Sequence, residues 1–317
     1  MKDTREKPLA ILTGPTASGK SDVSLALAER FDGEIVSADS MQIYRGMDIG
    51  TAKLPLAQRR GIPHHLMDIV EPTESFSVAD YVARAREAMD GIYSRGHLPI
   101  VVGGTGLYIN ALINPYNLQP AAARDPAYRQ ILKSQFDIDQ GETLHRQLQA
   151  IDPQAAQRIH PHDAQRLFRA LEVYRATKQT MSQWQSQNEQ PPAYRLAFLA
   201  LTMDRQRLYE RIDARVEQML AGGLAAEVEG LLRQGVSPQC QSMQGIGYRQ
   251  MVAWLQGDIP YEQAVGWIKR DTRRYAKRQY TWFKRDPRIL WLSREEYPEE
   301  EIPKQAAAAL LKAFEEA

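Results

Sequence analysis

The sequence Gly14-Pro-Thr-Ala-Ser-Gly-Lys-Ser21 lies between a short apolar run, PLAILT (residues 8–13), and the stretch SDVSLALAERF (21–31). Apolar residues recur in the second stretch at helical spacing, so the order is strand, glycine-rich loop, helix. This order and the spacing GxxxxGK[ST] are typical of a phosphate-binding loop. The glycines let consecutive backbone N–H groups point at one anion, and the helix that follows directs its positive end at the same place.

Two side chains of this loop contribute chemistry of their own. Lys20 adds a positive charge, and the hydroxyl of Ser21 can ligate Mg²⁺. The sequence therefore predicts that the whole loop binds a diphosphate or polyphosphate: Gly14, Pro15, Thr16, Ala17, Ser18, Gly19, Lys20 and Ser21. The alternative is a glycine-rich turn that caps a helix. The pattern does not specify which molecule carries the phosphates.

Three more apolar runs have the character of strands: GEIVSADS (33–40), LPIVVGGTG (98–106) and LAFLALTMD (196–204). Between the first two, SVADYVARAREAMDGIYSRG (77–96) has a helical pattern, with Ser77 and Asp80 giving a start like that of a capping box. Alternating strands and helices predict an α/β fold with a parallel sheet.

The pattern changes after residue 113. A loop-like segment is followed, up to about residue 187, by sequence with helical character throughout, with turn signals at Asp152-Pro153 and His160-Pro161. A proline-rich linker, QNEQPPAYR (187–195), then leads back to strand character. We therefore expect an all-helical insertion, residues 116–195, within an α/β core made of residues 1–115 and 196–317.

Composition excludes several classes of protein. The 317 residues carry 40 Lys and Arg against 39 Asp and Glu, a net charge of +1. The one cysteine, Cys240, excludes an internal disulfide framework and a cysteine-based zinc cluster. No run approaches the roughly 20 apolar residues of a membrane span, and the N-terminal apolar run is too short for a signal peptide. We expect a cytoplasmic protein with no membrane partner.

Asp39 follows the second predicted strand. Because the carboxyl ends of parallel strands face the ligand crevice, we expect Asp39 near the phosphate loop, as a general base or a Mg²⁺ ligand. The alternative is a helix cap or an Asx turn. The third strand ends in Gly103-Gly104 rather than in a second aspartate. This favours a small kinase-like transferase over a nucleotide-switch protein.

Basic residues gather locally despite the balanced total. Eight of the eighteen residues in KRDTRRYAKRQYTWFKRD (269–286) are basic, and aromatic residues are interleaved with them. Such a helix suits a surface that follows a nucleic-acid backbone, although a solvated amphipathic helix would have the same pattern. Arg211 and Arg215, one helical turn apart, are candidates for binding the diphosphate, with a surface ion pair as the alternative.

Seven segments together resemble one family closely, the tRNA dimethylallyltransferases, also called tRNA isopentenyltransferases. They are GPTASGKS (14–21), DSMQIY (39–44), GMDIGTAK (46–53), PHHLMDI (63–69), GGTGLY (103–108), RIHPHDAQRLFRALEV (158–173) and GIGYRQM (245–251). GMDIGTAK and HDAQR are the most specific of them. Some family members append a zinc finger. With one cysteine, this chain resembles the bacterial type that has none.

The resemblance implies a P-loop core like that of nucleotide kinases, with a helical insertion that contacts the anticodon arm of tRNA. It implies transfer of a dimethylallyl group from dimethylallyl diphosphate to N6 of the adenosine 3′ of the anticodon, in tRNAs that read codons beginning with U. The product is N6-isopentenyladenosine. The implied partners are tRNA and dimethylallyl diphosphate, the implied cofactor is Mg²⁺, and we expect a monomer.

The resemblance also assigns residues. Asp39 matches the family's general base, Arg215 matches an arginine that stabilises the leaving group, and Thr16 lies with them near the diphosphate. Family contacts to tRNA match Asp39, Ser40, Met41, Gln42, Thr105, Arg129, Gln165, Arg166, Leu167, Phe168, Arg169, Gln244, Gly245, Ile246, Gly247, Tyr248 and Arg249. His64 matches a family histidine whose role stays open. Two other hypotheses compete with this one: a P-loop kinase that phosphorylates a small metabolite or nucleoside with ATP, and a non-catalytic RNA-binding P-loop protein.

Overall fold

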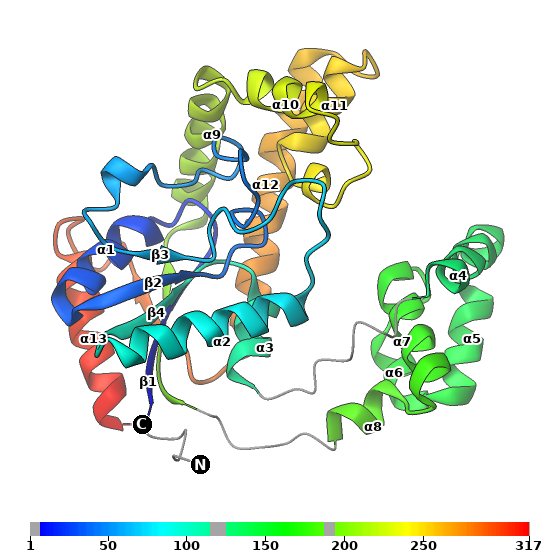
Figure 1. Cartoon of the computed structure of the whole chain (residues 1–317), viewed down its shortest axis with the longest axis horizontal. Coiled ribbons are helices and arrows are strands. Elements are labelled where there is room, and N and C mark those ends of the chain that lie inside the picture. The colour runs from blue at the N-terminus through cyan, green and yellow to red at the C-terminus, as the bar shows by residue number, and fades with distance from the viewer. Residues whose placement is uncertain (1–6, 115–124, 187–193, 317) are drawn as a thin grey trace. The chain divides into compact units, whose positions relative to one another are not determined.

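The computed structural model describes residues 7–114, 125–186 and 194–316 and divides the chain into two compact units (Figure 1). The first unit joins residues 1–113 to residues 193–317, and the second is residues 114–192. Most of the predicted loop 114–126 and of the linker 187–195 lies outside the described residues. Each unit is treated by itself below.

The first unit is built on one parallel sheet of six strands. The strands are β1 (Pro8–Thr13), β2 (Gly33–Ser37), β3 (His64–His65), β4 (Leu98–Val102), β5 (Arg195–Thr202) and β6 (Leu290–Ser293), in the spatial order β3-β2-β4-β1-β5-β6. The predicted α/β class and its four principal strands are confirmed. Since β1 lies in the centre, with Ala10 opposite Ile100 on one side and Ala197 on the other, its residues Leu9 to Leu12 are fully buried.

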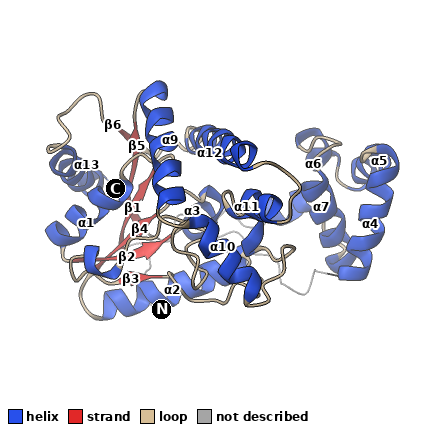
Figure 2. Ribbon diagram, turned by 90° about the horizontal axis from the view of Figure 1, so that it is seen from above, coloured by secondary structure: helices blue, strands red, loops and turns tan. Residues whose placement is uncertain are grey.

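Helices cover both faces of the sheet (Figure 2). Helices α1 (Lys20–Phe31) and α13 (Ile302–Glu316) pack on one face, and α2 (Val78–Ser94) packs on the other beside α3 (Gly106–Ile113). Ser77 caps α2 in the expected capping box, since its side chain accepts from the N–H of Asp80 while Asp80 accepts from the N–H of Ser77. The helices cover the faces of the sheet, so loops surround the carboxyl ends of its strands.

The rest of the first unit follows β5. It contains α9 (Arg205–Ala221), α10 (Leu224–Arg233), α11 (Tyr248–Leu255) and α12 (Tyr261–Phe283), with short 3₁₀ turns η2 (Leu56–Gln58) and η4 (Ser242–Gln244). Asp204 caps α9, because its side chain accepts hydrogen bonds from the backbone N–H groups of Gln206 and Arg207. α12 packs against α9, α11 and α3. None of the helices that the structure describes is both long and apolar enough to cross a membrane.

The second unit is helical in its described residues, as the sequence predicts. It contains α4 (Pro126–Asp139), α5 (Glu142–Ile151), α6 (Pro153–Arg158), α7 (Ala164–Thr177) and α8 (Met181–Ser186). The breaks fall at the predicted turns: Asp152 ends α5 and caps α6, and Pro161 lies between α6 and α7. Its core contains Leu132, Leu144, Leu148, Leu167 and Leu171, so it buries an apolar core of its own.

Candidate functional site

The phosphate loop joins β1 to α1 with the curled backbone that the motif predicts. Gly14 has φ +136°, and a Cβ there would lie 2.6 Å from the carbonyl oxygen of Leu201 in β5, so only glycine fits. Ala17 and Gly19 also have positive φ, 63° and 83°. The Nζ atom of Lys20 folds back and donates to the carbonyl oxygens of Gly14 and Pro15, at 3.1 and 2.8 Å.

Two arginines from distant parts of the chain hold two more carbonyl oxygens of this loop. Arg211 of α9 donates through Nε to the carbonyl oxygen of Ala17 at 2.9 Å. Arg294, which follows β6, donates to that of Ser18 at 3.0 Å, and the Arg294 residue is only 5% exposed. A Cβ on Gly19 would lie 2.4 Å from the guanidinium of Arg294, so that glycine is needed for the contact. Because hydrogen bonds hold these carbonyl groups, the loop can present its N–H groups to an anion.

Three charged groups predicted from the sequence lie close enough to influence one another. Burial, followed by the positive charge of Arg215, lowers the pKa of Lys20 from 10.5 to about 7, while Asp39 opposes the shift. Burial also lowers the pKa of Arg215, again against the effect of Asp39. Lys20, Arg215 and Asp39 are therefore close enough to interact electrostatically in a partly desolvated site, where the charge of Asp39 opposes the lowering of both pKa values.

Asp39 lies two residues beyond the end of β2. Its Oδ1 accepts from the N–H groups of Met41 and Gln42, at 2.8 and 3.3 Å, so the Asx turn considered as an alternative is present. The turn does not exclude a chemical role, because the second carboxylate oxygen is not needed for it. Thr105 ties this turn to the loop after β4, since its hydroxyl accepts from the N–H of Ser40 at 3.1 Å.

Helix α12 adds two side chains to this region that we did not predict there. Gln279 is 5% exposed, and its amide accepts from the N–H of Thr16 at 2.8 Å and donates to the carbonyl oxygen of Gly104 at 2.9 Å. One side chain thus links the phosphate loop to the loop after β4. Tyr275 lies one turn earlier. Burial, then the charge of Asp39, raises its pKa to about 12.

The segment GMDIGTAK is held by a carboxylate on α10. Glu227 accepts from the N–H groups of Asp48, Ile49 and Gly50 at 2.8, 2.8 and 3.1 Å, and from the hydroxyl of Tyr248 at 2.6 Å. The ring of Tyr248 packs so closely on Gly50 that a Cβ there would lie 2.6 Å from it. This contact joins the segment GMDIGTAK to the segment GIGYRQM.

The predicted tRNA contacts of the first unit lie around this site. Met41 packs on Gly245, where an added Cβ would lie 2.5 Å from its methyl carbon, so the 39–42 turn meets the 244–249 segment. Gln244 and Arg249 are exposed, Ile246 is half-buried, and Gly247 and Tyr248 are buried. Arg249 pairs with Asp271 at 2.8 Å.

The predicted contacts of the second unit are partly in its core. Leu167 and Phe168 are 0% and 7% exposed, so packing accounts for their side chains. Gln165 and Arg166 are exposed and Arg169 is half-buried. Arg129 pairs at 2.8 Å with Glu172, whose side chain is 1% exposed. The exposed surface of this stretch is therefore made mainly by its polar residues.

Ser21, the predicted metal ligand, and His64 lie in different parts of the fold. Ser21 is exposed in the first turn of α1, where its hydroxyl could contact an ion held by phosphate oxygens. Among the described residues, no group of three or more His, Cys, Asp or Glu could hold a metal. A magnesium ion bound here would therefore take most of its ligands from phosphate and water.

His64 is in β3. Its Nδ1 atom lies 2.8 Å from the carbonyl oxygen of Ile62, and burial lowers the pKa of its imidazole.

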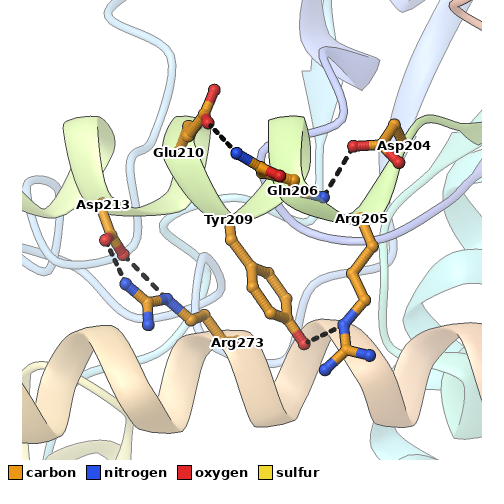
Figure 3. Close-up of a pocket in the computed structure, with 7 residues that line it drawn as sticks. All are labelled: Asp204, Arg205, Gln206, Tyr209, Glu210, Asp213 and Arg273. Carbon is orange, nitrogen blue, oxygen red and sulfur yellow. Dashed lines mark hydrogen bonds and ion pairs between the residues drawn. The ribbon is translucent and has the colours of Figure 1, made fainter.

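A shallow pocket of about 500 Å³ lies between α9 and α12 (Figure 3). Tyr209 stands in it between Arg205, which donates to its hydroxyl at 3.2 Å, and Arg273, whose guanidinium is 5.5 Å from its ring centre. Arg273 turns to pair with Asp213 of α9. Arg273 is thus an arginine of the basic stretch 269–286 that has a carboxylate partner on α9.

Comparison with known proteins agrees with this architecture. The family model for IPP transferase matches residues 42–286. The tRNA dimethylallyltransferase of Heliobacterium modesticaldum is 50% identical over 89% of this chain and 88% of its own, and that of Pelotomaculum thermopropionicum is 47% identical over 96% and 97%.

Solved structures give the same result. The tRNA isopentenylpyrophosphate transferase of Bacillus halodurans is 41% identical, with a TM-score of 0.74 and 98% of each chain covered. A eukaryotic dimethylallyltransferase described as acting on tRNA is 29% identical, with a TM-score of 0.81, covering 98% of this chain and 80% of its own. With the family model matching most of its length, the chain belongs to the IPP transferase family.

Proposed function

We propose that the protein is a tRNA dimethylallyltransferase, which transfers a dimethylallyl group from dimethylallyl diphosphate to N6 of the adenosine 3′ of the anticodon. The observation that supports this proposal is the electrostatic influence that Asp39 exerts on Lys20 and Arg215 beside the phosphate loop. The site offers an anion-binding loop for the leaving group and a carboxylate for the attacking amine. The names of the relatives support the same reaction.

The proposed chemistry follows from what each group can do. The amine attacks C1 of the prenyl group, the C–O bond to the diphosphate breaks, and the amine proton passes to Asp39. An adenine N6 amine is a weak nucleophile, so a base within reach assists as positive charge develops on it. Lys20, Arg215 and the N–H groups of the loop stabilise the departing diphosphate. Thr16 lies in the same loop.

We propose that Ser21 takes part in holding Mg²⁺ on the diphosphate oxygens. The ion would neutralise part of the leaving group's charge. The exposed Ser21 hydroxyl fits this role, because Mg²⁺ usually keeps several waters and needs few protein ligands when phosphate is present.

For the tRNA we propose the polar residues around the site and on the insertion. In the first unit these are Ser40, Gln42, Thr105, Gln244 and Arg249. In the second they are Arg129, Gln165, Arg166 and Arg169, on an anticodon-arm surface of the insertion. We propose that the enzyme acts as a monomer in the cytoplasm. An unpaired loop base costs little to turn out of its stack, which favours the anticodon loop as the place of reaction.

The test that separates this reaction from a kinase uses two labelled donors. The protein is incubated with an anticodon stem-loop RNA and either dimethylallyl diphosphate labelled in its prenyl group or ATP labelled in its γ-phosphate. We expect label in the RNA from the prenyl donor only. Label transferred only from ATP would contradict the proposal.

Replacing Asp39 by Asn tests the general base. Asn keeps an oxygen that can accept from Met41 and Gln42, so the turn is retained while the base is lost. We expect turnover to fall by roughly 10²- to 10⁴-fold with tRNA affinity little changed. Asp22→Asn, exposed in the first turn of α1, is the matched control. Equal turnover in the two variants would exclude Asp39 as the base.

The lowered pKa of Lys20 predicts a pH-dependent affinity for diphosphate. Lys20 is cationic below a pH of about 7 and neutral above it, so affinity for inorganic diphosphate should fall as pH rises through 7. The variant Lys20→Arg remains charged and should lose this dependence, while the protonation of diphosphate itself affects both proteins equally. Calorimetric titration between about pH 6 and pH 9 measures the difference. Parallel profiles would exclude Lys20 as its source.

The exposed basic face of α12 predicts salt-sensitive RNA binding. Lys277 and Arg278 are exposed, and within the described part of the chain no carboxylate pairs with them. Replacing both by Gln should weaken RNA binding and lower the slope of log K against log salt by roughly 1 to 2. Lys304→Gln, exposed on α13, should leave that slope unchanged. If the double variant keeps the wild-type slope, this face is only solvated.

A further inference from the structure

Lys53, the last residue of the segment GMDIGTAK, is a buried cation that the proposed reaction does not use. The residue is 8% exposed, and its side chain alone is 4% exposed. A lysine is seldom buried unless its charge is paired and its hydrogen bonds are made, because taking an ammonium group out of water is costly. The surroundings of Lys53 therefore have to supply partners for that charge.

The ammonium group of Lys53 has one partner for each of its three N–H donors. Nζ donates to the carbonyl oxygen of Tyr44 at 2.9 Å, to Oδ1 of Asp48 at 2.6 Å and to Oδ1 of Asp68 at 2.5 Å. An ammonium group has three donors and no acceptor, so this set uses it completely. The side chains of Asp48 and Asp68 are partly exposed, while the cation between them is not. Three acceptors are thus fixed around one buried point.

These acceptors belong to three separate segments of the chain. They are DSMQIY (39–44), GMDIGTAK (46–53) and PHHLMDI (63–69), all of which carry the resemblance to the family. Asp68 has φ +55°, in the left-handed region that residues other than glycine seldom adopt. Such a conformation persists where its surroundings enforce it. The bond from Lys53 is a contact able to do so.

Gln42 connects this junction to Asp39. Its N–H donates to Oδ1 of Asp39 at 3.3 Å, and its carbonyl oxygen accepts from the N–H of Asp68 at 3.2 Å. Its side-chain amide donates to the carbonyl oxygen of Thr51, two residues before Lys53, at 3.2 Å. The residue that completes the turn of Asp39 is therefore bonded to two of the segments that Lys53 joins.

We propose that Lys53 is a positioning residue, which holds the turn that carries Asp39 and Gln42 in the conformation that the reaction needs. The hydroxyl of Thr105 fixes the start of this turn by accepting from the N–H of Ser40, and the Lys53 junction fixes its end. The inference rests on the proposed function for the role of the turn. Because protein acceptors use all three donors of Lys53, it acts through the turn and not on a substrate.

The test replaces Lys53 by Met, which has a similar length but neither a charge nor a donor. Lys304→Met, exposed on α13, is the matched control. Asp68→Asn is a milder change at the same junction, because Asn keeps an oxygen that can accept from Lys53 and loses only the charge. All three variants are made in the full chain.

The first measurement is hydrogen exchange of the backbone amides in the free protein. In Lys53→Met we expect peptides that cover residues 40–46 and 66–71 to exchange roughly 10-fold faster or more, because the N–H groups of these segments bond to one another beside the junction. Peptides that cover β1 and the phosphate loop should exchange as in the wild type. Lys304→Met should match the wild type throughout.

The second measurement separates kcat from KM. In Lys53→Met we expect kcat for transfer to an anticodon stem-loop RNA to fall by roughly 10- to 100-fold, because a displacement of about 1 Å in a reacting group costs that much. The KM for dimethylallyl diphosphate and the affinity for inorganic diphosphate should stay close to those of the wild type, since the phosphate loop does not bond to Lys53. Asp68→Asn should change kcat in the same direction by less.

Three outcomes would overturn the proposal. The first is unchanged exchange in residues 40–46 of Lys53→Met. The second is faster exchange throughout the chain together with weaker diphosphate binding, which would make Lys53 a residue of general stability. The third is an unchanged kcat in spite of faster local exchange. If Lys53→Met does not fold, the same criteria apply to Asp68→Asn.

Failure of this inference is distinguishable from failure of the proposed function. The exchange measurement uses no substrate, so it decides whether Lys53 holds the turn in either case. A wild-type protein that transfers no prenyl group to the RNA would refute the proposed reaction. A wild-type protein that transfers it, beside a Lys53→Met variant that does so equally well, would refute only the role of Lys53.

Discussion

The site depends on one constraint, the polarity of the backbone in the phosphate loop. A loop that presents N–H groups to an anion must turn its carbonyl groups elsewhere, and those oxygens also need partners. Here Lys20, Arg211 and Arg294 supply them, from α1, α9 and the end of β6. The loop is therefore shaped by cations on its carbonyl side before any ligand arrives. Two of those cations come from the part of the chain beyond the insertion, so the loop reaches this form only in the complete core.

Close approach of α12 to the sheet is a second condition. Gly104 and Gly106 lie beneath Gln279 and Trp282, and an added Cβ would lie 2.0 and 2.2 Å from those side chains. Because the glycines leave this room, one amide can join the phosphate loop to the loop of Thr105. The phosphate loop, which we propose binds the prenyl donor, is thereby tied to the loop of Thr105, which we propose contacts the tRNA. Glu227 fixes the 46–53 segment by accepting hydrogen bonds from three consecutive N–H groups.

Local patterns in the sequence predicted the elements well. The strands, the capping box at Ser77 and the breaks at Asp152 and Pro161 each depend on a few neighbouring residues, so short-range chemistry determines them. The phosphate loop and Asp39 were found for the same reason, since both follow directly on a strand. Gln279, Arg294 and Glu227 were not found. Each is an ordinary helix or strand-end residue whose partner lies far away in the chain, and no local spacing marks it. Leu167 and Phe168 show a different limit: the family motif predicted them as tRNA contacts, but it also includes residues whose side chains are buried in the core.

The position of the insertion has a consequence for how the chain folds during synthesis. β1 is the central strand, and its partner on one side is β5, with Pro8 opposite Arg195. While the ribosome makes α4–α8, the sheet of β1, β2, β3 and β4 has β1 as an open edge, with the apolar run of residues 9–12. We expect the helical unit, with its own core, to become compact during that interval. The nascent enzyme is then most prone to aggregation in the interval between the synthesis of β4 and that of β5, and a chaperone that shields the β1 edge would act at that stage.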